Sequence, residues 1–87
     1  MDVVKTKHRN KYVTDVRILR ESPLSLFALS RILPNCPGVD TVRLWASHGR
    51  QLEGKRKVVK LGTVAGTAGR MSSMAAYERF IMAINEG

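Results

Sequence analysis

The chain has 87 residues, of which 44% are apolar, and it carries a formal net charge of +8. A chain of this length forms one small domain, with no room for a second domain or a deep catalytic cleft. Its single cysteine cannot form an internal disulfide, which is typical of a reducing compartment. There is no apolar run near the ~20 residues of a membrane span, and the N-terminus lacks the apolar stretch of a signal peptide. We therefore expect a cytoplasmic protein without a membrane partner.

The positive charge is concentrated in two segments. Residues 1–20 carry six basic and two acidic residues, which gives +4, and residues 50–60 carry five basic residues and one acidic residue, which again gives +4. The rest of the chain sums to zero. Basic tails alone are common, but two separate clusters are typical of a surface that binds a polyanion such as a nucleic acid.

The N-terminal segment, residues 1–20, is predicted to be a basic, flexible arm, and residues 21–87 are predicted to form the folded domain. Within the arm, the run 12–19 fits either a short strand or one or two helical turns. Its pattern of apolar residues does not distinguish the two.

The first predicted helix follows Ser25, whose side chain can accept a hydrogen bond from the free amides of a first helical turn. The helix ends before Pro34, because the residue that precedes a proline avoids the helical region. Residues 35–38 then form a turn. The apolar residues between Ser25 and Pro34 have the spacing of one helix face: Leu26, Leu29, Ile32 and Leu33.

A second helix is expected to begin at or near Asp40, because an acidic residue suits a helix start. It is expected to end at Gly49, which favours the left-handed conformation that closes a helix. The residues expected on its inner face are Val42, Trp45 and Ala46, with Val39 packing across the helix start. Those expected on its other faces are Thr41, Arg43, Leu44, Ser47 and His48.

The second half of the chain predicts a charged loop, a hairpin and a third helix. Residues 50–57 have no apolar period, whereas residues 58–64 have the β-branched content of a strand. The glycine-rich run 65–69 can turn, and residues 70–71 can pair back. A third helix is expected from Ser72 or Ser73. Its broad apolar stripe consists of Ala76, Tyr77, Phe80, Ile81 and Ile84.

This order of elements, mainly α with a small β-hairpin, resembles the winged helix-turn-helix domain of phage excisionases and of the wider MerR-like group. The run 41–45, Thr-Val-Arg-Leu-Trp, is similar to the start of an excisionase recognition helix. The chain also resembles a family of small uncharacterised proteins found mainly in planctomycete bacteria. That likeness is carried by four stretches: residues 24–34, 39–45, 58–62 and 71–80, the last ending Tyr-Glu-Arg-Phe. This resemblance implies the fold of the chain more than its biochemical function.

The resemblance and the charge map together lead us to expect a small DNA-binding protein of the bacterial nucleoid. It would be a transcriptional regulator or a recombination and excision accessory factor, with helix 40–48 in the major groove of double-stranded DNA. The excisionase pattern makes Asp40, Thr41 and Arg43 candidates for contact. Excisionases have basic residues where this chain has Leu44 and Ser47, a departure that weakens an excisionase-like set of base contacts.

The expected DNA contacts fall into three groups. The residues of the recognition helix are Asp40, Thr41, Arg43, Leu44, Ser47 and His48. The residues expected to hold phosphates, together with the N-terminal arm, are Arg50, Lys55, Arg56 and Lys57. The tip of the wing is uncharged, so insertion of the wing into a minor groove would depend on Lys60 and Arg70 at its base.

Two other classes of function stay open. An exposed Leu44 is compatible with a protein-interaction module that keeps the winged fold, with a second copy or a larger regulatory or recombination protein as its partner. RNA binding by the basic segments is the third class, although exposed aromatics for stacking are lacking. Neither His8 nor His48 has a metal-ligand spacing with Cys36, so we expect no metal. We also expect no cofactor and no enzymatic activity.

Overall fold

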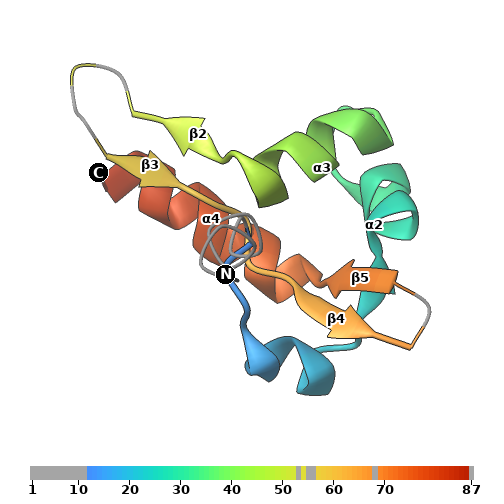
Figure 1. Ribbon diagram of the computed structural model, residues 1–87. Helices are drawn as coiled ribbons and strands as arrows, with labels where there is room; N and C mark the ends of the chain where they lie inside the picture. Colours follow the sequence, from blue (N-terminus) through green and yellow to red (C-terminus); the bar gives the residue numbers. More distant parts are fainter. Residues whose placement is uncertain (1–11, 53, 55–56, 68, 87) are drawn as a thin grey trace, which may run out of the picture.

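The computed structural model describes residues 12–52, 54, 57–67 and 69–86, and these form a mixed α/β arrangement (Figure 1). The described residues contain three α-helices, a 3-10 helix and five short strands. In chain order they are η1 (Val16–Arg20), β1 (Leu24–Ser25), α2 (Leu26–Ile32), α3 (Val39–Ser47), β2 (Arg50–Gln51), β3 (Val58–Val59), β4 (Val64–Gly66), β5 (Gly69–Ser72) and α4 (Met74–Glu86). None of the described helices is long and apolar enough to cross a membrane.

The strands form two small antiparallel sheets, where the sequence predicted a single hairpin. In the first sheet β5 lies between β1 and β4, and Val64 pairs with Met71. In the second sheet β2 pairs with β3, and Arg50 lies opposite Val59. The predicted combination of helices with a small antiparallel sheet is therefore confirmed, and the single predicted hairpin is corrected to two hairpins in a mixed α/β fold.

The second hairpin forms because one apolar residue interrupts the charged run 50–57. Leu52 is 6% exposed and belongs to the hydrophobic core, and its amide donates to the carbonyl of Lys57 at 3.0 Å. The predicted strand 58–64 is broken after Val59, because the amide of Leu61 donates instead to the carbonyl of Trp45 at 3.1 Å. The chain thus leaves one sheet, contacts the end of α3, and enters the other sheet.

Helix α2 begins and ends where the sequence predicted. The Ser25 hydroxyl accepts a hydrogen bond from the amide of Ala28 at 3.0 Å, and the helix ends just before Pro34. Of the four apolar residues expected on its inner face, Leu26, Leu29 and Leu33 are buried. Ile32 is 56% exposed, because it lies about a quarter turn from the centre of that stripe.

The C-terminal end of α3 is closed by Gly49, as predicted. This residue has a φ of +79°, and its amide donates to the carbonyl of Leu44 at 3.0 Å. A Cβ at this position would lie 2.5 Å from the carbonyl oxygen of Val59, too close for any side chain. Glycine is therefore required by the backbone conformation and by the close approach of β3. The end of α3 is held directly against the second hairpin.

The third helix, α4, covers the core from the far side. Ser73 caps it, since its hydroxyl accepts from the amide of Ala76 at 2.9 Å. Trp45 of α3 contacts two aromatic rings of α4, with centroids 6.2 Å from Tyr77 and 5.4 Å from Phe80. This contact confirms Trp45 as an inner-face residue of α3.

Residues 12–20 belong to the folded unit, which differs from the predicted arm. Ile18 of η1 is 0% exposed and sits in the core. Before it, the amide of Asp15 donates to the carbonyl of Thr63 at 2.9 Å, and the amide of Thr63 donates to the carbonyl of Val13 at 3.0 Å. The run 12–19 thus combines a short parallel bridge with a 3-10 turn. The rest of the predicted arm, residues 1–11, lies outside the described residues.

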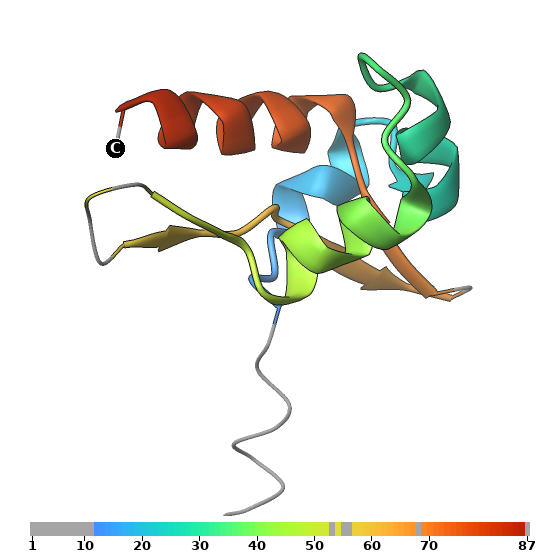
Figure 2. The same cartoon turned by 90° about the horizontal axis from the view of Figure 1, so that it is seen from above.

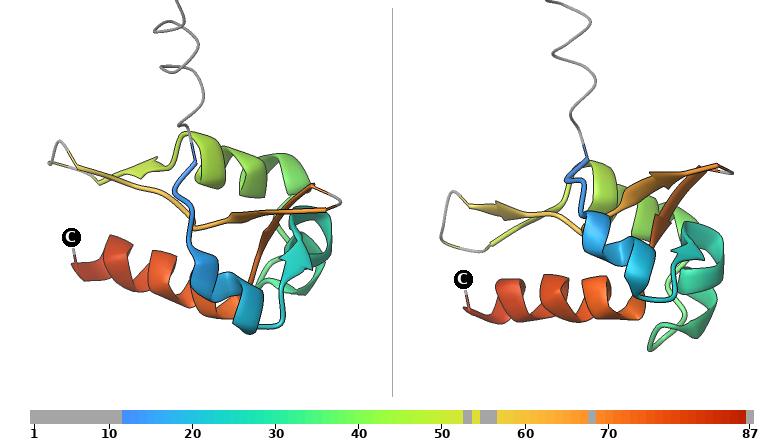
Figure 3. Two further views of the ribbon diagram at one scale, coloured as in Figure 1. Left: turned by 60° about the horizontal axis from the view of Figure 1, so that its bottom comes forward. Right: turned by 90° about the horizontal axis from the view of Figure 1, so that it is seen from below.

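The elements are arranged so that α3 and α4 lie on opposite sides of the molecule, as Figures 2 and 3 show. The β2–β3 and β4–β5 hairpins extend in opposite directions, with α3 between them. One side of the molecule therefore presents a helix flanked by two hairpins.

Candidate nucleic-acid interface

Helix α3 presents an outward face that contains every recognition-helix residue proposed from the sequence. Its inner residues Val42 and Ala46 are fully buried. The residues of its outer surface are Asp40, Thr41, Arg43, Leu44, Ser47 and the C-cap residue His48. All of them are exposed except Ser47, which is half-buried. The predicted division of this helix into inner and outer residues is confirmed.

The polar side chains of this face interact with one another. Nη1 of Arg43 lies 3.6 Å from Oδ1 of Asp40, one helical turn away. The hydroxyl of Ser47 donates to the carbonyl of Arg43 at 2.9 Å and lies 2.9 Å from Nδ1 of His48. Because a hydroxyl has a single hydrogen, Nδ1 of His48 must donate to Ser47. Leu44 is the apolar member of the face and is 53% exposed.

The predicted loop cations lie on the β2–β3 hairpin, next to the C-terminal end of α3. Arg50 is exposed on β2, and Lys57 is exposed just before β3. Lys60 follows β3 and is half-buried. Two further cations proposed from the sequence, Lys55 and Arg56, lie outside the described residues. The hairpin thus brings cations separated in sequence to the same end of α3.

Arg70 has a different environment from the hairpin cations. Its guanidinium donates to the hydroxyl of Thr63 at 2.9 Å and lies over the ring of Tyr12, 4.2 Å from the ring centroid. These contacts connect β5 to the N-terminal segment. Arg70 was expected to support insertion of the wing into a minor groove, but its guanidinium already has two partners within the protein.

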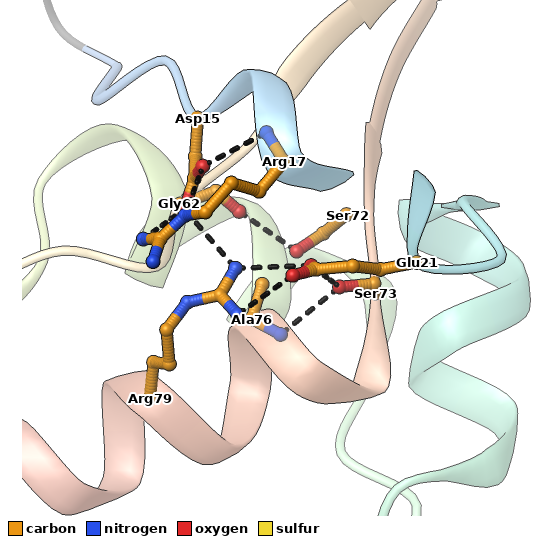
Figure 4. Close-up of polar contacts among 8 residues, drawn as sticks. All are labelled: Asp15, Arg17, Glu21, Gly62, Ser72, Ser73, Ala76 and Arg79. Carbon is orange, nitrogen blue, oxygen red and sulfur yellow. Dashed lines mark hydrogen bonds and ion pairs between the residues drawn. The ribbon is translucent and has the colours of Figure 1, made fainter. Parts of the chain in front are cut away.

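A network of two carboxylates and two guanidinium groups, which the sequence did not reveal, lies between η1 and α4 (Figure 4). Arg79 donates to both carboxylate oxygens of Glu21, at 2.8 and 3.0 Å, and to Asp15 at 3.0 Å. Arg17 donates to both oxygens of Asp15, at 2.9 and 2.8 Å, and the hydroxyl of Ser73 donates to Glu21 at 2.9 Å. Two positive and two negative charges cancel here, so the network is structural.

The network also shapes the surface charge. It neutralises Asp15 and Glu21, and Glu78 and Glu86 belong to α4 on the far side. Asp40 is therefore the one acidic residue that the structure describes in α3 and the β2–β3 hairpin. The described cations of α3, of this hairpin and of the residue after β3 are Arg43, Arg50, Lys57 and Lys60. Cations thus outnumber acidic residues in this described part of the chain.

The network makes the stability of the protein depend on acid pH. The side-chain hydrogen bonds from Arg17 lower the pKa of Asp15 from 3.8 to about 2, and the hydrogen bonds from Arg79 lower the pKa of Glu21. A carboxylate with a lowered pKa stabilises the folded state fully above its unfolded-state pKa. For Asp15 this contribution is lost as the pH falls from about 4 to about 2.

We therefore expect the stability difference between the natural chain and an Asp15→Asn variant to be largest above about pH 4 and to shrink towards about pH 2. Urea unfolding across this range measures the difference. Glu78→Gln, which removes an exposed carboxylate of α4 outside the network, is the control. A stability difference that is constant with pH would contradict the assignment of Asp15.

Comparisons with protein-family models, with curated proteins and with solved structures found no match to this chain. The likeness to excisionases and to the planctomycete proteins stays a prediction from the residues quoted for it.

Proposed function

We propose that this protein is a small DNA-binding protein with a winged helix-turn-helix fold, in which α3 enters the major groove. The observation that carries the proposal is the outward face of α3, which lies between two hairpins, one of which carries exposed cations. DNA carries a negative charge about every 1.7 Å along its axis, so these cations would attract it.

The dimensions of α3 support the proposal. An α-helix with its side chains is about 10–12 Å in diameter, and the major groove, about 12 Å wide, admits one. With α3 in the groove, the β2–β3 hairpin would extend towards the phosphates beside it. Arg50 and Lys57 would then contact the backbone and fix the register of the helix.

The proposed contact serves a transcriptional regulator and a recombination accessory factor equally, because both need one helix in the groove and phosphate contacts beside it. Either role implies association with the bacterial nucleoid. Leu44 motivates a second candidate, a protein-interaction module, because it places an exposed apolar side chain at the centre of the outward face of α3.

The proposal is tested with two charge reversals that change the net charge equally. Arg50→Glu affects the β2–β3 hairpin, whereas Arg20→Glu affects an exposed residue of η1, away from the α3 side. We expect Arg50→Glu to weaken binding to a random-sequence duplex by about tenfold, and Arg20→Glu by about twofold at most. Fluorescence anisotropy at moderate salt measures both.

Equal losses for the two variants would mean that overall charge, rather than the α3 side, attracts DNA. Absence of binding by the natural chain at low salt would reject DNA binding altogether and favour the protein-interaction module. Circular dichroism establishes that both variants are folded before the titrations are compared.

A further inference from the structure

Leu44 occupies the centre of the outward face of α3. It is two residues from Val42 and two from Ala46, which places it about 200° around the helix from each of these buried residues. Asp40 and Ser47 share its stripe, at spacings of four and three residues. An isobutyl group that is 53% exposed therefore occupies the most outward position of the helix.

Two polar neighbours of Leu44 are engaged within α3, whereas Thr41, three residues before it, is exposed. The Ser47 hydroxyl is hydrogen-bonded to the Arg43 carbonyl and to His48, and the guanidinium of Arg43 is drawn towards Asp40. The Ser47 hydroxyl has thus used its one donor, and Arg43 would have to leave Asp40 to reach a base edge. The side chain at the centre that is ready for a new contact is apolar.

We propose that Leu44 recognises the 5-methyl group of thymine, so that α3 prefers major grooves rich in A·T pairs. This inference rests on the proposed DNA-binding function. The thymine methyl is the apolar group that the major groove presents among its donors and acceptors. A leucine at the most outward point of a helix in that groove would contact it and exclude water from both groups.

The charge around Leu44 favours DNA over a second copy of the chain as the occupant of this face. Arg50 and Lys57 are exposed at the end of α3, and the chain as a whole carries +8. Two such faces brought together would repel each other, whereas a phosphate backbone on either side of the groove would neutralise these cations.

The test uses duplexes that differ by a methyl group. One pair is an alternating A·T duplex and the same duplex with deoxyuridine in place of thymidine. The other is an alternating G·C duplex and its counterpart with 5-methylcytosine, which puts the methyl in the major groove of a G·C pair. We expect the natural chain to bind the methylated member of each pair about three- to fivefold more tightly, as the burial of one methyl group implies.

The variant Leu44→Ala is expected to bind both members of each pair equally, because alanine is too short to reach the methyl group. Met82→Ala is the matched control, since Met82 is similarly exposed, at 57%, on the opposite helix α4. The Met82→Ala variant is expected to keep the preference for the methylated duplexes. Circular dichroism checks that both variants are folded.

The outcomes separate this inference from the function on which it rests. Salt-dependent DNA binding with equal affinity for methylated and unmethylated duplexes would overturn the role of Leu44 and leave DNA binding intact. If the natural chain bound none of the duplexes, both the role of Leu44 and the proposed DNA binding would be overturned. Sedimentation velocity that reveals a dimer in the natural chain, and a monomer after Leu44→Ala, would identify a second copy as the occupant and overturn the inference.

Discussion

Replacing Ile18 with alanine is expected to lower the free energy of unfolding by about 2–5 kcal/mol. Ile18 is 0% exposed, and its Cδ1 atom lies 3.9 Å from the position that a Cβ on Gly62 would take. Deleting most of this side chain leaves a cavity between η1 and the β3–β4 connection. A domain of this size has a total stability of only about 5–15 kcal/mol, so the loss is a large part of it. Urea unfolding followed by circular dichroism measures the change.

The matched control is Leu19→Ala, which removes a side chain of similar size from the next position of the same 3-10 helix. Leu19 is 53% exposed, so we expect its replacement to change stability by no more than about 0.5 kcal/mol. If the two variants lose stability equally, or if neither does, η1 is not anchored through Ile18. The comparison thus distinguishes a folded segment from an arm that moves independently of the domain.

The second large effect is the salt dependence of DNA binding. We expect the affinity for a random-sequence duplex to fall about a thousandfold between about 50 mM and about 200 mM salt, because contacts with ~6 phosphates release counterions. The proposed number of phosphates corresponds to the six cations expected from the sequence in and around α3 and the β2–β3 hairpin, of which Lys55 and Arg56 lie outside the described residues. Fluorescence anisotropy at several salt concentrations gives the slope of log affinity against log salt, expected near −5.

Removing one cation tests which residues determine that slope. Arg50→Gln is expected to reduce its magnitude by about 1, whereas Arg20→Gln, on η1, leaves it unchanged. A slope near zero in the natural chain would be incompatible with phosphate contacts. A slope unaffected by Arg50→Gln would exclude the β2–β3 hairpin from the interface.

The helices followed from signals that act within a few residues. Ser25 and Ser73 cap helices because a hydroxyl reaches amides that lie three residues ahead. Pro34 prevents its predecessor from being helical, and Gly49 adopts a φ that other residues avoid. The outward face of α3 could be predicted for the same reason, since helical periodicity alone separates Val42 from Leu44.

The strands and the N-terminal boundary depended on partners distant in the chain. The short run that became β2 has little strand preference of its own, and it pairs with the β-branched β3 because Leu52 enters a core that other elements build. Ile18 looks in the sequence like one apolar residue in a basic tail. It is buried because Val13 and Asp15 hydrogen-bond to Thr63, some 50 residues later, and hold the segment against the domain.

For this protein, the sequence by itself determined the three helices, the sides of α3 and the two basic segments, because capping, periodicity and charge are local properties. The tertiary structure alone decided that Arg70 lies over Tyr12 and that Arg79 joins Glu21 and Asp15, residues 58 and 64 positions away. It also decided which carboxylates are neutralised by ion pairs. Those outcomes depend on the distances between side chains after folding, and no local pattern in the chain encodes them.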